Sequence, residues 1–118
     1  GASLPSPKEA VERIVEEEAW RQILSSLVIC FFARGVYKAD LVAAALDSLG
    51  YSYSEDELKK LGREIYLEKQ RLKREEGFSA KNLSIPGRLY QVDTPLGKID
   101  RRYVEEALAY FDQLIEEG

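Results

Sequence analysis

The chain has 118 residues, of which 45% are hydrophobic and 32% are charged, a composition typical of one globular domain. Its net charge of −4 argues against a general nucleic-acid binder, and no apolar run approaches the roughly 18 residues of a membrane-spanning helix. The absence of histidine excludes His-based catalytic triads and the usual zinc and copper sites. A single cysteine cannot form an internal disulfide, so we expect a cytoplasmic protein. Many charges beside one asparagine indicate a thermophilic source.

The first predicted element is one long helix over residues 7–33, or two helices joined near Ser25-Ser26. Residues 1–5 before it are expected to be a disordered leader or the remnant of a tag, and residues 6–118 to form the helical domain. Ser6 and Glu9 have the spacing of a capping box, which marks a helix start. The second half of this stretch is apolar nearly all round, which indicates a buried helix or a face that awaits a partner.

Two further helices are predicted over residues 38–49 and 54–76. Gly50 and Gly77 are their expected C-terminal stops, and Ser54 with Glu57 forms a second capping box. The expected buried side of the first of these helices consists of Leu41, Val42, Ala45, Leu46 and Leu49. The lysines and arginines of the second are interleaved with glutamates, which favours a solvated face over a nucleic-acid patch.

Residues 78–99 form a long irregular loop in this interpretation, because prolines and glycines interrupt it repeatedly. A short strand is expected at residues 88–92, and Asp100 is the expected cap of a last helix. The sequence therefore predicts an all-α single domain of four to five helices, with one long irregular loop before the last.

Cys30 is the one cysteine, and its residue type alone leaves three interpretations. Free cysteine is among the most buried residue types, so a small hydrophobe in the core is favoured. A nucleophile would lack a histidine, and Arg34 is the only nearby cation. A single thiolate cannot hold an iron–sulfur cluster, which normally needs four cysteine ligands.

The succession of motifs from about residue 20 resembles the C-terminal domain of the tungsten- and molybdenum-pterin aldehyde:ferredoxin oxidoreductases. That family carries a motif Asp-x-x-Gly-Leu-Cys, and the matching stretch here is residues 25–30, which read Ser-Ser-Leu-Val-Ile-Cys. Its later Gly-x-Arg-Ile and Arg-rich segments are similar to "LGREIYLEKQRLKREEGF", and its Leu-Pro-x-Arg segment is similar to the stretch around Pro86.

The resemblance implies a role for Cys30, since the motif cysteine of the family is the fourth ligand of a [4Fe-4S] cluster. The other three ligands lie in a Cys-x-x-Cys-x-x-x-Cys segment of a preceding domain, which has no counterpart in these residues. The motif aspartate helps to hold the pterin, and Ser25 stands in its place. Val28 stands in the place of the motif glycine, so close backbone approach is not expected there.

Three hypotheses follow. In the first, the chain is a fragment of an aldehyde ferredoxin oxidoreductase-like protein whose electron transfer needs the missing domains, with Cys30 completing a cluster. In the second, it is a relative without cofactors that acts as a helical interaction module or as a homodimer through residues 23–33. The third, an unrelated small enzyme, is disfavoured by the lack of any nucleophile–base pair. We expect oxidoreductase ancestry without catalysis by the isolated chain, no cofactor in it, and Cys30 as a buried thiol.

Overall fold

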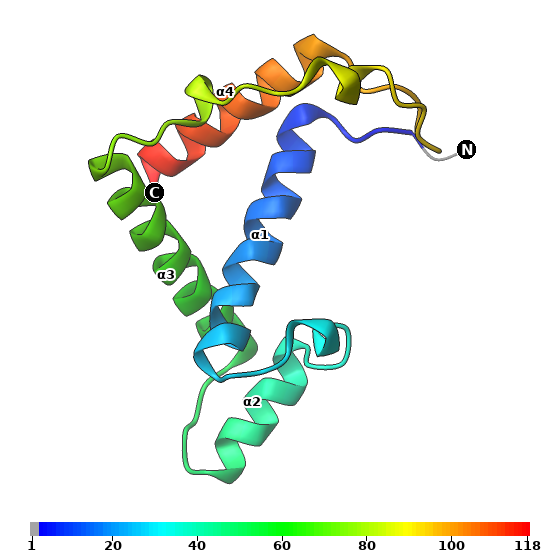
Figure 1. Cartoon of the computed structure of the whole chain (residues 1–118). Coiled ribbons are helices and arrows are strands. Elements are labelled where there is room, and N and C mark those ends of the chain that lie inside the picture. The colour runs from blue at the N-terminus through cyan, green and yellow to red at the C-terminus, as the bar shows by residue number, and fades with distance from the viewer. Residues whose placement is uncertain (1–2) are drawn as a thin grey trace. The chain divides into compact units, whose positions relative to one another are not determined.

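The computed structural model describes residues 3–118, which form four α-helices. These are α1 (Pro7–Ser26), α2 (Ala39–Ser48), α3 (Glu55–Glu75) and α4 (Arg101–Glu117), shown in Figure 1. Three short 3-10 helices, η1 (Phe31–Ala33), η2 (Ala80–Asn82) and η3 (Gly87–Tyr90), lie in the connections. The described residues contain no strand, and the long irregular segment precedes the last helix, so the predicted all-α class is confirmed. None of the helices in this part of the chain has the length and apolar character needed to span a membrane.

The strand predicted over residues 88–92 is wrong. Pro86 begins a local turn there, and the backbone N–H of Leu89 donates to the carbonyl oxygen of Pro86 at 3.0 Å. The N–H of Gln91 donates in the same way to Arg88 at 3.1 Å, which gives the 3-10 helix η3. These bonds to the third residue back use the backbone groups that a strand would pair with a neighbour.

The predicted helix starts are confirmed by their side-chain caps. Ser6 Oγ accepts the N–H of Glu9 at 3.2 Å, while the Glu9 carboxylate accepts the N–H of Ser6 at 2.9 Å. Ser54 and Glu57 form the same reciprocal pair at 3.1 and 2.8 Å. The Asp100 carboxylate accepts the N–H of Tyr103 at 2.7 Å at the start of α4. Each cap satisfies backbone donors that the first helical turn leaves without a partner.

Three helices end in the same hydrogen-bonded motif. Gly50 and Gly77 follow their helices with a positive φ of 89° and 91°. In each case the N–H of the next residue donates to the carbonyl oxygen five residues earlier. At the end of α1 the N–H of Ile29 donates to Leu24 at 2.9 Å and that of Val28 to Ser25 at 3.1 Å. This is the Schellman motif, with Val28 at φ 58° where glycine is usual. It explains why α1 ends at Ser26, where the alternative of two helices places a junction, and does not continue to residue 33.

The chain divides into two compact units. The central unit comprises Val15–Lys69, and the terminal unit comprises the residues up to Ile14 together with Gln70–Gly118. Of the predicted leader, Gly1 and Ala2 lie outside the described residues. The carbonyl oxygen of Pro5 accepts a hydrogen bond from the Tyr103 hydroxyl at 2.8 Å.

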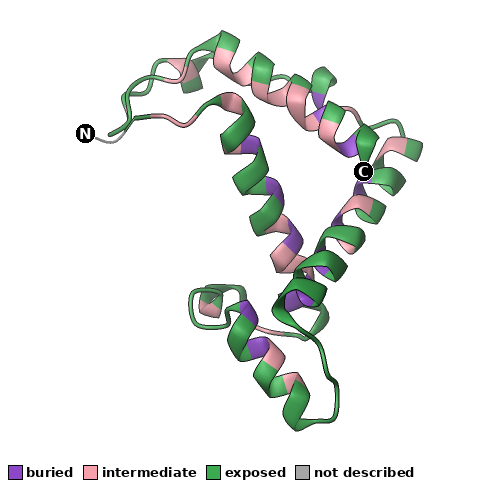
Figure 2. Ribbon diagram, turned by 180° about the vertical axis from the view of Figure 1, so that it is seen from behind, coloured by how far each residue is buried: buried purple, intermediate pink, exposed green. Residues whose placement is uncertain are grey.

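The core of the central unit is small and draws on three helices. Gly62 of α3 lies against α1 so closely that a β-carbon there would meet the carbonyl oxygen of Ala19 at 2.5 Å. Of the predicted buried side of α2, Val42 is buried and Leu46 partly so, whereas Leu41, Ala45 and Leu49 are exposed, so much of α2 is accessible (Figure 2). The buried cluster consists of Ile23, Leu24, Val42 and Leu58, with Trp20, Ile29, Ala43, Leu46 and Ile65 packed against it.

The terminal unit is organised around one buried carboxylate. Asp112 of α4 is 2% exposed and accepts hydrogen bonds from the N–H groups of Ala80 and Lys81, both at 3.2 Å, and from the Ser79 hydroxyl at 3.1 Å. Arg74 of α3 lies 3.5 Å from the same carboxylate. Burial by itself raises the pKa of Asp112, but these donors and the guanidinium outweigh it and hold the pKa below its usual range. The ionised side chain therefore fastens η2 to α4.

Candidate functional site around Cys30

Cys30 lies in the loop between α1 and η1, and its side chain is exposed. The prediction of a buried thiol is therefore wrong. It rested on the usual burial of free cysteine, but the Schellman motif at Val28 ends α1 before this residue and leaves it on a loop. In that motif Ile29 turns inward onto Leu24 and the core cluster, and Cys30 follows on the solvent side.

The segment after Cys30 is held against α1 by cation–π contacts of two arginines with the Phe31 ring, an arrangement that we call the Phe31 sandwich. The guanidinium carbon of Arg21 lies 4.6 Å from the centre of the Phe31 ring, and that of Arg34 lies 4.2 Å from it. Glu17 of α1 pairs with both arginines, at 2.8 Å to Arg21 and 3.9 Å to Arg34. Cation–π contacts of this kind contribute about 0.5–1 kcal/mol each at exposed sites. The sandwich thus fixes η1, and with it the position of the thiol.

Ser25, the other predicted site residue, lies in the last turn of α1 and is exposed. Its carbonyl oxygen accepts the N–H of Val28, so Ser25 and Cys30 belong to the same helix ending. Serine offers a neutral hydroxyl where the resemblance places a carboxylate. The donor set at this position therefore does not fit the pterin contact that the resemblance implies.

A complete metal centre does not fit the residues that the structure describes. No group of three or more histidine, cysteine, aspartate or glutamate side chains among residues 3–118 could hold a metal ion. Cys30 offers one thiolate, exposed and on a fixed loop, which fits one ligand of a cluster whose other ligands come from elsewhere.

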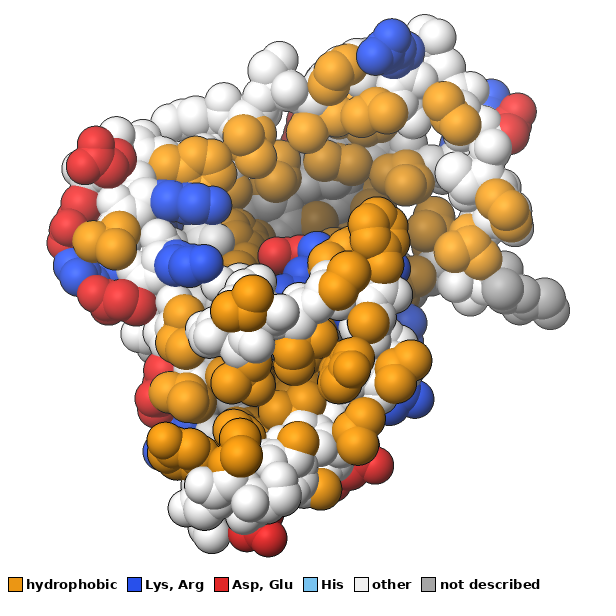
Figure 3. Space-filling view, turned by 60° about the horizontal axis from the view of Figure 1, so that its bottom comes forward, with side chains coloured by type: hydrophobic (Ala, Val, Ile, Leu, Met, Phe, Trp, Pro, Cys, Tyr) orange, Lys and Arg blue, Asp and Glu red, His pale blue; other side chains and the backbone are white. Residues whose placement is uncertain are grey.

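Apolar side chains flank Cys30 on the same loop. Val28 is 91% exposed and Phe32 is 89% exposed, while Leu27 and Phe31 are partly exposed. The space-filling view shows hydrophobic side chains gathered over α2 and the loops beside it (Figure 3). Several exposed apolar side chains within one short segment mark an interaction site more often than scattered single residues do. We call Leu27, Val28, Cys30, Phe31 and Phe32 the Cys30 surface.

Comparison with known families finds a match that covers almost the whole chain. Residues 2–117 match the family described as aldehyde ferredoxin oxidoreductase, domains 2 & 3. The chain belongs to the aldehyde ferredoxin oxidoreductase family. No curated protein and no solved structure shows significant similarity to it. The family resemblance inferred from the sequence is confirmed, and membership of the aldehyde ferredoxin oxidoreductases implies iron–sulfur and tungstopterin cofactors for the family.

Sequence reasoning missed the conformation of Val28, although one signal could have revealed it. The aldehyde ferredoxin oxidoreductase motif has glycine at this position, and glycine just after a helix indicates a left-handed residue. The valine here keeps that backbone conformation without the residue type that favours it. Reasoning from residue type also missed the Phe31 sandwich, because the pairing of Arg21 with Arg34 depends on the chain turning back at Val28.

Proposed function

We propose that this chain is a non-catalytic part of an aldehyde ferredoxin oxidoreductase-type protein, in which Cys30 supplies one ligand of a [4Fe-4S] cluster. The remaining ligands would come from another domain or subunit. The observation that carries this proposal is the exposure of Cys30 on a loop that the Schellman motif and the Phe31 sandwich hold in place. A bound cluster would supply one-electron transfer, and this chain's part is to hold the thiolate at a fixed position.

The surroundings of Cys30 support a role at a junction between protein parts. A ligand shared between domains has to lie at the surface of its own domain, and Cys30 does. Val28 and Phe32 present apolar surface beside it that a covering domain would shield from water. Exclusion of solvent around a cluster is one of the factors that set its reduction potential.

Co-expression with a segment that carries Cys-x-x-Cys-x-x-x-Cys, followed by anaerobic purification, tests this proposal. We expect the complex to contain iron and to absorb in the visible range, and Cys30→Ser to lower the iron content while the complex still forms. Ser25→Ala is the matched control in the same helix ending, and its iron content should equal that of the wild type. A colourless, iron-free complex, or a Cys30→Ser complex with unchanged iron, overturns the assignment.

We propose as a second candidate a homodimer, or another helical interaction, through residues 23–33. The exposure of Phe32 and Val28 favours it, because both side chains are almost fully accessible. Sedimentation of the wild type and of Phe32→Glu tests it, with the exposed Tyr51→Glu as the control. A dimer that only Phe32→Glu dissociates supports this candidate, and a monomeric wild type contradicts it. Phe31 is the less suitable position, because its ring also holds Arg21 and Arg34.

Composition supports two further proposals. A cytoplasmic location is consistent with one unpaired cysteine, and a thermophilic source is consistent with the high content of charged residues.

A further inference from the structure

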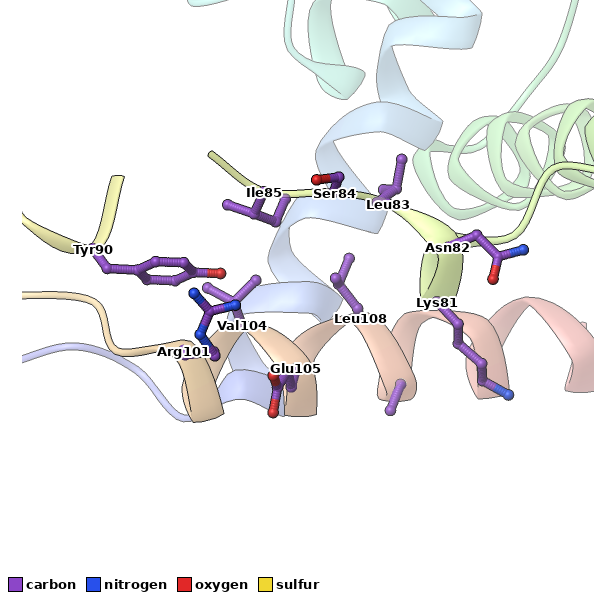
Figure 4. Close-up of a pocket in the computed structure, with 11 residues that line it drawn as sticks. Lys81, Asn82, Leu83, Ser84, Ile85, Tyr90, Arg101, Val104, Glu105 and Leu108 are labelled. Atoms are coloured by element: carbon purple, nitrogen blue, oxygen red, sulfur yellow. The ribbon is translucent and has the colours of Figure 1, made fainter. Parts of the chain in front are cut away.

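A cleft of about 490 Å³ lies within the terminal unit, between α4 and the segment that precedes it (Figure 4). Its volume falls in the range of small-molecule sites in proteins. Leu83 and Ile85 line it from the segment side, and Val104 and Leu108 from α4. Tyr90 and Arg101 close one end.

The cleft exists because the segment is fastened to α4 at both ends and not in the middle. At one end the N–H groups of Ala80 and Lys81 donate to the Asp112 carboxylate. At the other end the guanidinium carbon of Arg101 lies 4.9 Å from the centre of the Tyr90 ring. The middle of the segment passes over α4 and leaves an open gap.

The cleft contains one inward-facing positive charge, and its lining combines apolar side chains with polar ones such as Asn82 and Ser84. The Arg101 guanidinium lies beneath Tyr90 in the gap, whereas the charged ends of Lys81 and Glu105 point away from it (Figure 4). Among the described residues no ion pair involves Arg101, and its contact is with the Tyr90 ring. Its neighbour Arg102 forms an ion pair with Glu106 at 2.8 Å. Arg101 thus keeps its hydrogen-bond donors available beside the Tyr90 ring.

We propose that this cleft binds a small carboxylate with an apolar tail. The carboxylate would pair with the planar guanidinium of Arg101, whose two parallel donors match its two oxygens. The tail would lie between Ile85 and the one-turn pair Val104 and Leu108. One guanidinium without a second inward cation suits a single negative charge, and it disfavours a phosphate dianion. The proposal is independent of Cys30, which belongs to the other unit.

Titration of the full chain with decanoate tests the proposal, with decanol as the uncharged probe of the same chain length. Isothermal calorimetry should show saturable binding of decanoate and clearly weaker binding of decanol. Arg101→Gln should weaken decanoate binding by about tenfold or more, the usual cost of losing a charged hydrogen-bond partner. Arg102→Gln is the matched control, because it removes the neighbouring charge that points to Glu106 instead, and it should leave the affinity unchanged.

A second measurement locates the tail. In methyl NMR spectra, decanoate should shift the signals of Val104 and Leu108 more than those of Leu72, an exposed leucine of α3 in the same unit that does not line the cleft. The proposal is overturned if decanoate shows no saturable binding, or if decanol binds as tightly. It also fails if Arg102→Gln weakens binding as much as Arg101→Gln does.

Discussion

Replacement of Val28 by glycine should stabilise the protein, although it removes a hydrophobic side chain. Val28 occupies the left-handed position of the Schellman motif at φ 58°, a conformation that costs an L-residue roughly 1–2 kcal/mol and is least favourable for a β-branched side chain. The side chain is 91% exposed, so its removal sacrifices only about 0.2 kcal/mol of burial. Glycine costs about 0.5–1 kcal/mol in the entropy of the unfolded chain. The balance is a gain of about 0.5 kcal/mol in the free energy of unfolding, at the midpoints of these magnitudes.

Urea denaturation followed by circular dichroism measures this difference, and Val36→Gly is the matched control. Val36 is an exposed loop valine of the same unit, 67% accessible, whose φ is not positive. Glycine there brings the entropic cost without relief of strain, so it should destabilise by about 1 kcal/mol. Val28→Ala should give a free energy of unfolding between those of the wild type and Val28→Gly. If Val28→Gly destabilises the protein as much as Val36→Gly, the backbone at Val28 is not strained and the reasoning is refuted.

Three further predictions concern single side chains. Gly62→Ala should lower the free energy of unfolding by about 1–3 kcal/mol in urea denaturation, because the new methyl would overlap the carbonyl of Ala19. Helix propensity alone predicts the opposite, a gain of about 1 kcal/mol, and that result would contradict the close approach of the two helices. Because the folded state lowers the pKa of Asp112, its stabilising effect is complete above the unfolded pKa of about 4 and is lost as the pH falls below that value. Asp112→Asn should therefore lower the free energy of unfolding by about 2 kcal/mol at neutral pH and make that free energy less dependent on pH in the acid range. Glu116→Gln alters an exposed partner of Arg74 and should have neither effect. Cys30 should react with a thiol reagent in the native protein at a rate close to that in urea, and strong native protection would show that it is not exposed.

The local rules for helix starts predicted most of the fold. Ser6, Ser54 and Asp100 all cap helices as their spacing indicates, because the capping bonds depend only on residues three apart. Gly50 and Gly77 end helices for an equally local reason, the ease with which glycine adopts a positive φ. The end of α1 was predicted only as one of two alternatives, because its left-handed residue is a valine and apolar periodicity continues past it.

The candidate site was less predictable than the helices. The exposure of Cys30 could not be predicted from the sequence, because burial depends on where the preceding helix ends. Asp112 carried no sequence signal, since an aspartate within an acidic helix is normally exposed and this one is buried by η2 folding back. Gly62 was recognised only as part of a motif, whereas its physical role is contact between two helices distant in the sequence.

The two changed motif positions have different consequences for the proposed cluster ligand. Val28 has the left-handed backbone that glycine adopts easily, so the turn that exposes Cys30 forms at a cost in strain. Ser25 lies in the last turn of α1 and offers a hydroxyl, so it cannot supply the carboxylate that the resemblance implies for a pterin contact. The stability of Val28→Gly and its iron content in the proposed complex together separate the strain at this turn from the proposed ligand role of Cys30.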